Sequence, residues 1–234
     1  MPPEFAALLQ AITVGALPLI FAITFHEAAH GYVAYKLGDD TAWKAGRVTF
    51  NPLRHIDLFG TIILPLVLFL GSSGRFSFGY AKPVPVRFDR LNRLRRDMVL
   101  VAAAGPATNL LLAIVSVMLL GGVAAMHLPG FFQTWTEANL FNSLRFNLIL
   151  GVFNMIPLPP LDGGRVAVGL LPEALAAPLA RSERYGILIL ITLIFLLPVI
   201  GDKINMNLDI FGSIVSWPVD WLIRNMLRLM GLSA

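Results

Sequence analysis

Long apolar segments constrain the fold of this chain more than any other feature. Their lengths approach or exceed the roughly 20 residues that cross a bilayer as a helix, and they span residues 5–37, 98–127, 138–155, 185–200 and 210–230. Charged residues make up only 14% of the chain, whereas soluble proteins carry roughly 25%. A soluble globular protein needs a polar shell that this composition cannot supply, and a disordered chain would be far less apolar. The sequence therefore predicts an all-α polytopic membrane protein with about five to six transmembrane helices.

The basic residues concentrate in a few loops and predict which of these loops face the cytoplasm. Four Lys or Arg lie within residues 36–55, seven within 71–97 and three within 163–184, whereas 128–144 contain none. The positive-inside rule places the first three of these regions in the cytoplasm. The net charge of +4 comes without the aromatic–basic interleaving of nucleic-acid modules. We therefore expect the lipid bilayer, and no nucleic acid, as a partner.

A shorter apolar run, residues 58–70, lies between two of these positive regions. It is interrupted by Gly60 and Pro65, and its length is more typical of a re-entrant or buried segment than of a span. The flanking stretches 46–50 and 71–86 favour short strands or extended loops over helix. We therefore expect a short re-entrant or β-hairpin element on the cytoplasmic side.

The first apolar run contains the ionisable sequence His26-Glu27-Ala28-Ala29-His30. Ionisable side chains at membrane depth are costly and usually serve a function. Residues four apart lie on one face of a helix, so the two imidazoles can bind one Zn²⁺ while Glu27 lies beside the metal and its water. The alternative is a pair of buried histidines that hydrogen-bond to neighbouring helices, which would leave three costly residues serving packing alone.

A hydrolytic zinc site needs a third protein ligand and one open position, and Asp162 is the candidate. The chain has no cysteine, so every ligand must be His, Asp or Glu. Prolines end the helix predicted for 138–155 just before Asp162, although a surface turn would have the same local sequence. Topology supports the metal site, because one crossing at 98–127 and a re-entrant 58–70 place His30 and Asp162 on the same, cytoplasmic, side.

These residues resemble the site-2 protease family (peptidase family M50) of intramembrane zinc metalloproteases. The resemblance covers about residues 10–170 and is carried by three motifs: His26-Glu-Ala-Ala-His30, Gly105-Pro-Ala-Thr-Asn109, and Asn154-x-x-Pro157 followed by Leu161-Asp162-Gly163. Segments 51–57 and 81–85 look like the compact bacterial branch of the family, which has no PDZ or CBS domain.

The resemblance implies one Zn²⁺ per chain, bound by His26, His30 and Asp162, with Glu27 as the general base. It implies that Asn154 lies beside the site and helps to hold the substrate or the tetrahedral oxygen. The implied activity is cleavage of membrane-spanning protein substrates near the cytoplasmic side of the cell (inner) membrane, often in regulated signalling. The implied mode of substrate binding is β-strand addition to the cytoplasmic region, because a helical substrate hides its peptide bonds.

We accordingly expect a single integral-membrane metalloprotease domain over residues 1–234, with a catalytic core at about 10–170 and C-terminal transmembrane helices at about 185–231. A membrane metal carrier that uses the same buried His and Asp is the alternative, which the absence of an internal repeat disfavours. His55 is predicted to have a structural or gating role, since a hydrolytic zinc keeps one position for water. For Asn109 two roles remain open, a hydrogen bond to the re-entrant element or a cap on a helix contact.

Overall fold

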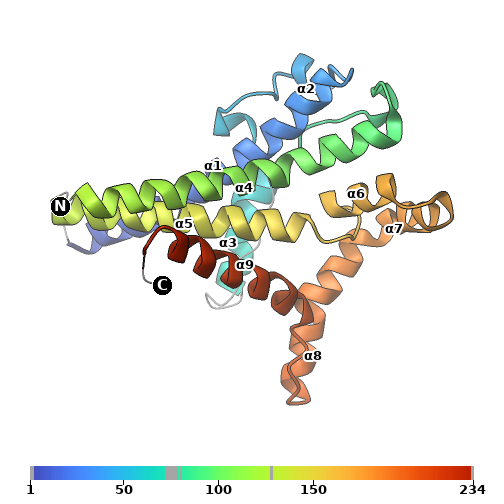
Figure 1. The fold of residues 1–234 in the computed structure, drawn as a ribbon. Helices are drawn as coiled ribbons and strands as arrows, with labels where there is room; N and C mark the ends of the chain where they lie inside the picture. Colours follow the sequence, from blue (N-terminus) through green and yellow to red (C-terminus); the bar gives the residue numbers. More distant parts are fainter. Residues whose placement is uncertain (1–2, 72–78, 80, 127–128, 233–234) are drawn as a thin grey trace.

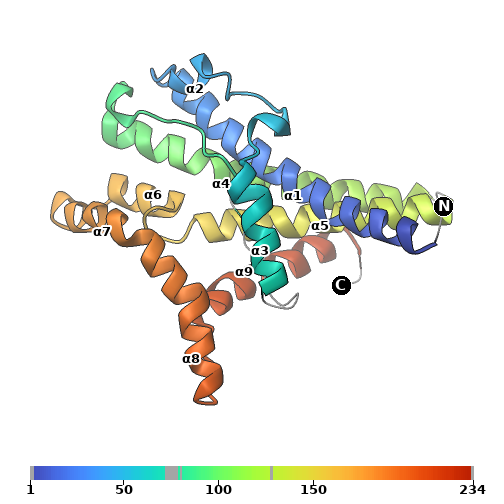
Figure 2. The same ribbon diagram turned by 180° about the vertical axis from the view of Figure 1, so that it is seen from behind.

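A computed structural model describes residues 3–71, 79, 81–126 and 129–232 of the chain. Within these residues every regular element is helical and none is a strand. Three long helices lie side by side and form the body of the molecule (Figures 1 and 2): α1 (Pro3–Lys36), α4 (Leu94–Met126) and α5 (Gly130–Asn154). The all-α prediction is confirmed for the described residues.

Three helical segments are long and apolar enough to cross a membrane by length and composition: Leu9–Lys36, Leu94–Met126 and Glu173–Lys203. The first two correspond to α1 and α4. Helix α5 does not meet these criteria, yet it packs against both of them. The predicted count of five to six spans is therefore not confirmed. Polar side chains on the face of α5 that meets α1 and α4 lower the mean hydropathy of this helix.

The short apolar run forms a helix that begins with a wide π-helical turn, η2 (Leu58–Ile63), and continues as α3 (Leu64–Gly71). At 1.5 Å per residue these 14 residues extend about 21 Å at most, short of the roughly 30 Å hydrocarbon core. The predicted β-hairpin is not found among the described residues. Residues 46–50 form a turn followed by bends, and 81–87 are extended without strand pairing. Residues 72–78 and 80 lie outside the described residues.

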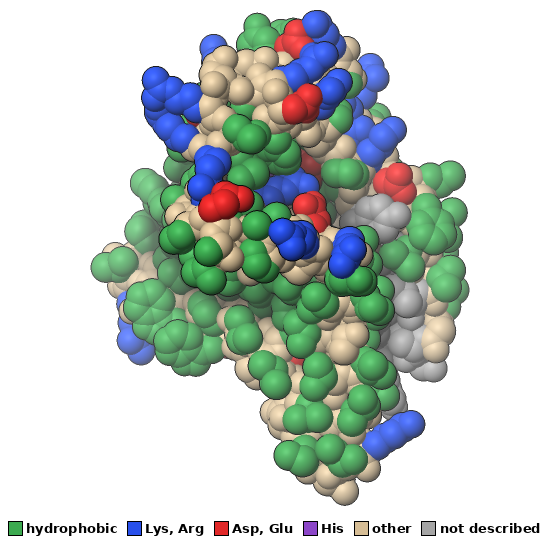
Figure 3. All heavy atoms as spheres, turned by 90° about the vertical axis from the view of Figure 1, so that its right-hand side faces the viewer, with side chains coloured by type: hydrophobic (Ala, Val, Ile, Leu, Met, Phe, Trp, Pro, Cys, Tyr) green, Lys and Arg blue, Asp and Glu red, His purple; other side chains and the backbone are tan. Residues whose placement is uncertain are grey.

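Short helices cover the end of the bundle at which α1 finishes and α4 begins. They are α2 (Thr41–Lys44), η1 (Pro52–Arg54) and η3 (Phe88–Arg90). Lys and Arg side chains gather on the upper half of the face shown in Figure 3, and hydrophobic side chains cover most of its lower half. This separation is the one expected for a protein whose basic loops lie on one side of a membrane.

After α5 the chain turns back through α6 (Asp162–Leu170) and then leaves the bundle as an arm (Figures 1 and 2). The arm consists of α7 (Glu173–Ile191), a π-helical turn η4 (Thr192–Leu196) and α8 (Leu197–Lys203).

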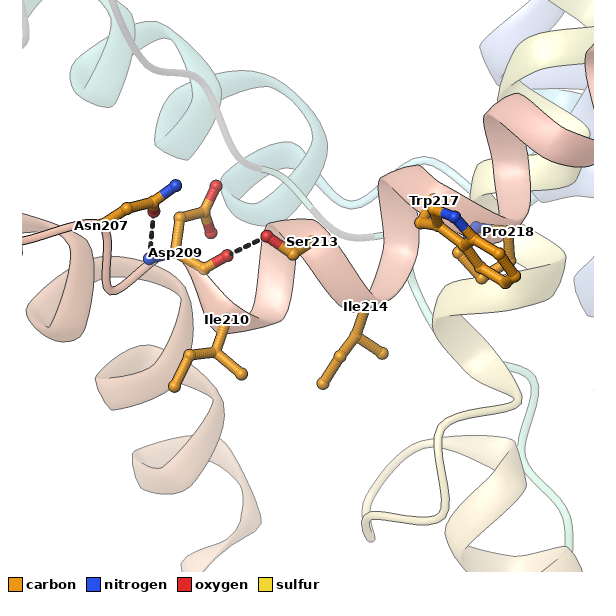
Figure 4. A pocket seen from close by; sticks show the side chains of 7 residues that line it. All are labelled: Asn207, Asp209, Ile210, Ser213, Ile214, Trp217 and Pro218. Atoms are coloured by element: carbon orange, nitrogen blue, oxygen red, sulfur yellow. Dashed lines mark hydrogen bonds between the residues drawn. The ribbon is translucent and has the colours of Figure 1, made fainter.

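Helix α9 (Ile210–Leu229) returns to the bundle and packs on α5. The buried core between α4, α5 and α9 consists of Ala113, Val117, Leu120, Leu144, Leu148, Val219 and Leu227. At the start of α9, Asn207 accepts a hydrogen bond from the N–H of Asp209, and Ser213 donates to the Asp209 carbonyl (Figure 4). The cavity at this turn, about 550 Å³, contains none of the predicted site residues.

Candidate metal centre

Three of the predicted site residues meet at one point between α1 and the start of α6. The Nε2 atoms of His26 and His30 are 3.0 Å apart, and Asp162 Oδ2 lies 3.2 Å from the first and 3.3 Å from the second. Both imidazoles are buried, and no other group within the described part of the chain brings three potential metal ligands together. The structure therefore joins two residues from one helix turn with a third that is more than 130 positions away in the chain.

Hydrogen bonds at the far side of each ring determine where the imidazole protons lie. His30 Nδ1 is 2.7 Å from the carbonyl oxygen of Val101, and His26 Nδ1 is 2.6 Å from Asn109 Oδ1. Both partners are acceptors, so each Nδ1 must carry the proton. In the neutral rings, both Nε2 lone pairs then point at each other and at Asp162, whose Oδ2 atom has no hydrogen-bond partner.

This convergence of lone pairs fits a bound cation. Protonating one imidazole would satisfy only part of the triangle, whereas a metal ion would satisfy all three atoms together. A tetrahedral zinc with bonds of about 2.0–2.1 Å places its ligand atoms about 3.3–3.4 Å apart. The observed separations of 3.0, 3.2 and 3.3 Å are close to this value. Two imidazoles and one carboxylate are also a donor set that hydrolytic zinc sites use.

Gly105 of α4 makes room for the two imidazoles. A Cβ atom at this position would lie 2.4 Å from His30 Nε2 and 2.7 Å from His26 Nε2. Any side chain here would therefore occupy the space in which the ligand atoms meet. The glycine of the Gly105–Asn109 motif is required by this close approach, which allows α4 to pack directly over the histidine face of α1.

The break between α5 and α6 positions Asp162. Helix α5 ends at Asn154, and α6 begins at Asp162 itself. A Cβ atom at Gly163 would lie 2.3 Å from the Met155 carbonyl oxygen, and one at Gly164 would lie 2.3 Å from the backbone nitrogen of Pro159. Only glycines allow the chain to fold back this tightly, as the sequence predicts, and the turn directs the carboxylate towards α1.

Of the two roles left open for Asn109, the structure shows the helix contact, and it adds a hydrogen bond to His26. Its Nδ2 donates to the Ala22 carbonyl of α1 at 3.2 Å and to Asn147 Oδ1 of α5 at 2.8 Å, which is the helix contact among the two roles, and this directs its Oδ1 to His26. Asn147 in turn donates to the carbonyl of Ser143. Both asparagines are almost completely buried. This chain of hydrogen bonds fixes the ring orientation and tautomer of one ligand, as second-shell partners of metal sites commonly do.

Asn147 was missed by the sequence reasoning. A polar residue within an apolar helix is costly, and its spacing of seven residues from Asn154 places both on the same face of the helix, about two turns apart. That spacing was a signal that α5 carries a polar face. The sequence could not indicate which helix this face meets, because the rotation of α5 relative to α4 is set by packing.

Glu27 lies between the two histidines in the sequence, and its Oε2 accepts a hydrogen bond of 2.8 Å from the backbone N–H of Val84. Asn154 is the last residue of α5, and its side-chain amide donates to the Leu150 carbonyl of its own helix rather than to a metal ligand. Its role at the site remains a prediction. His55 is buried and its Nε2 donates to the Thr49 carbonyl at 2.9 Å, while its buried Nδ1 has no hydrogen-bond partner among the described residues. Its structural or gating role remains a prediction.

Comparison with known proteins identifies the family. Residues 14–143 and 134–199 match the model described as peptidase family M50. The chain belongs to peptidase family M50. It is 40% identical to the Bacillus subtilis protein named "Putative zinc metalloprotease YwhC", over 87% of this chain and 84% of that protein.

Other members of the family extend the comparison beyond Bacillus. Rip2 of Mycolicibacterium smegmatis, which carries the same description, is 32% identical over 75% of this chain and 64% of its own length. MJ0611 of Methanocaldococcus jannaschii, also described in this way, is 32% identical over 70% of this chain and 73% of its own length. No solved structure gives a significant match.

Membership of family M50 and the three apolar helices make this chain a multi-pass membrane protein of a metalloprotease family. Zinc is the metal that the names of its relatives give, and His26, His30 and Asp162 form the group that can hold it. The metal-carrier alternative is not favoured by these relatives.

Proposed function

We propose that this protein is an intramembrane zinc endopeptidase that cuts membrane-spanning substrate proteins near the cytoplasmic side of the cell (inner) membrane. The observation that supports this most directly is the meeting of three potential ligand atoms, one each from His26, His30 and Asp162, in the cytoplasm-directed half of a helix long enough to span the bilayer. A metal site placed there can reach peptide bonds that a soluble protease cannot. Its substrates would be cut as part of regulated intramembrane proteolysis.

In this proposal each residue has a defined task. When bound, zinc supplies the Lewis acidity that makes water a nucleophile at neutral pH and offsets charge on the substrate carbonyl oxygen. His26, His30 and Asp162 would hold it, as the three protein ligands that a hydrolytic zinc site uses. Glu27 accepts the proton of the attacking water and returns it to the leaving amine.

The environment of the site supports the same proposal. Asn109 and the carbonyl of Val101 each accept the Nδ1 proton of one histidine, so in the neutral rings both Nε2 lone pairs are available to a metal. Asn154 lies at the end of α5, close in sequence to Asp162, and would help to hold the substrate carbonyl. An unwound substrate would lie along the extended cytoplasmic backbone and add to it as a strand. We place the whole activity in one domain, residues 1–234.

The experiment that tests this function compares wild type with Glu27→Gln in proteoliposomes that contain a membrane-spanning reporter. Glu27→Gln removes the base but none of the three ligands, so we expect unchanged zinc content and a loss of cleavage of at least 100-fold. Glu137→Gln makes the same chemical change at a residue whose hydrogen-bond partner among the described residues is Gln133, and this variant should cleave like wild type. Cleavage retained by Glu27→Gln would refute the mechanism.

A further inference from the structure

An extended segment, residues 82–87, lies against α1 next to Glu27, and we call it the strap. Three of its backbone N–H groups donate hydrogen bonds to acceptors elsewhere in the chain. Lys82 donates to the His55 carbonyl at 2.9 Å, Val84 to Glu27 Oε2 at 2.8 Å, and Arg87 to Asp39 Oδ2 at 2.6 Å. Pro83 and Pro85 have no N–H. Val84 therefore supplies the only backbone donor from residue 83 to residue 85, and Glu27 receives it.

The strap packs closely against α1 through the side chain of Val84. The Val84 side chain is buried above Gly31, where a Cβ atom would lie 3.0 Å from Val84 Cγ1. Gly31 directly follows the ligand His30, so the closest approach of the strap occurs beside the predicted metal centre. Asp39, which binds the far end of the strap, is completely buried and also accepts from Thr41.

A buried arginine holds the near end of the strap. The side chain of Arg47 is 7% exposed, and its Nη2 donates to the Lys82 carbonyl at 2.5 Å and lies 3.5 Å from the Pro83 carbonyl. Within the described residues Arg47 forms no ion pair. A buried cation is costly unless it is hydrogen-bonded. The described hydrogen-bond partners of the Arg47 side chain are the carbonyls of Lys82 and Pro83, which immediately precede the Val84 amide.

We propose that Arg47 is a positioning residue for Glu27 and acts on it through the strap. This inference rests on the proposed function, in which Glu27 is the base. The Val84 N–H holds Oε2, which leaves Oε1 to accept the proton of the attacking water. A general base must lie within about 2.6–3.2 Å of its proton donor, and a displacement of about 1 Å can cost roughly 100-fold in rate.

Hydrogen exchange tests the contact itself in the full-length protein in detergent. Because both neighbours of Val84 are prolines, a fragment that reports residues 83–85 contains a single exchanging amide. Arg47→Met keeps the length of the side chain but removes the donors, so we expect exchange of this amide to be at least 10-fold faster. Glu27→Ala removes the acceptor and should have the same effect. Arg54→Met, the same change at an exposed arginine of the same cytoplasmic region, should leave the rate unchanged.

Kinetics in proteoliposomes with the membrane-spanning reporter test the consequence. Arg47→Met should lower kcat by about 10- to 100-fold while KM stays within about threefold. Zinc per chain should not change, because no ligand is touched. Arg47→Lys retains one donor and should recover part of the loss. An unchanged kcat, a parallel loss of zinc, or a rise in KM alone would overturn the positioning role.

A second pair of variants applies if Arg47→Met does not fold. Gly31→Ala places a Cβ atom 3.0 Å from Val84 Cγ1 and equally close to Val48 Cγ2, so the strap and the segment that contains Val48 must both shift, whereas Gly15→Ala in the same helix meets nothing within 4 Å. We expect faster Val84 exchange and a lower kcat for the first and neither for the second. Equal behaviour of the two would overturn the proposal. A wild-type protein that cleaves nothing would contradict the proposed function, and the exchange rates would still decide whether Arg47 holds the strap on Glu27.

Discussion

Gly105→Ala adds a single methyl group at the point where the two histidine ligands meet, and its effect follows directly from the geometry. The new Cβ atom would lie 2.4 Å from His30 Nε2 and 2.5 Å from His26 Cε1. Ordinary contacts between such atoms are about 3.5 Å. The imidazoles, the helix α4 or both must therefore move by about 1 Å.

A movement of this size is large for a metal site. Functional ligand distances hold within about 0.2 Å, so a shift of about 1 Å should remove at least one histidine from the coordination sphere. We expect zinc affinity to fall by at least 100-fold, which corresponds to about 2.7 kcal/mol. The new methyl group also clashes with buried side chains of the folded protein. This clash destabilises the fold, so the thermal midpoint should fall together with metal binding.

The matched control is Gly122→Ala, which lies in the same helix and meets nothing within 4 Å. Both variants gain the same intrinsic helix propensity, about 1 kcal/mol at most, so propensity cannot explain a difference between them. Zinc binding to the purified proteins is measured by competition with a chelating indicator, and folding by the thermal midpoint. A Gly105→Ala protein that binds zinc within threefold of the Gly122→Ala protein would refute the assigned metal centre.

Two further substitutions test how the ligands are held. Asn109→Leu removes the acceptor that fixes the tautomer of His26, and we expect zinc affinity to fall by about 10- to 100-fold. The same change at the half-buried Asn225, whose amide donates to the Trp221 carbonyl of its own helix, should leave zinc affinity unchanged, and equal affinities of the two variants would contradict the role of Asn109. Gly163→Ala would place a Cβ atom 2.3 Å from the Met155 carbonyl oxygen. Because this oxygen belongs to the backbone, the clash can be relieved only by moving the turn. Zinc content should therefore fall by at least 10-fold, and the thermal midpoint should drop. Metal analysis of the purified variant checks this, and wild-type zinc content in Gly163→Ala would show that the turn does not position Asp162.

The sequence predicted the metal ligands because the information needed is local. Helical periodicity places His26 and His30 on one face wherever the helix lies, and the prolines before Asp162 end the preceding helix wherever it packs. The all-α class followed in the same way from long apolar runs. The number of spans was less predictable, because α5 carries asparagines that lower its apolarity and are buried only through contact with its neighbours.

The extended region shows a second limit of sequence reasoning. Glycine, proline and β-branched residues predicted extended backbone near residues 81–86, and the chain there is extended. The backbone donors of the strap, however, bind the carboxylates of Glu27 and Asp39 and the His55 carbonyl instead of a neighbouring strand. Composition indicates that a segment is extended but does not determine which acceptors lie beside it.

By itself the sequence determined that this is a helical membrane protein. It also indicated two histidines and an aspartate for one metal and a glutamate for the water beside it. Only the tertiary structure decided how these groups are held. Asn109 directs His26, Gly105 admits both rings, and the strap holds Glu27, and each of these contacts joins segments that are far apart in the chain. The physical reason is that periodicity within a helix is fixed by its backbone, whereas the rotation and depth of one helix against another depend on the packing of all its neighbours.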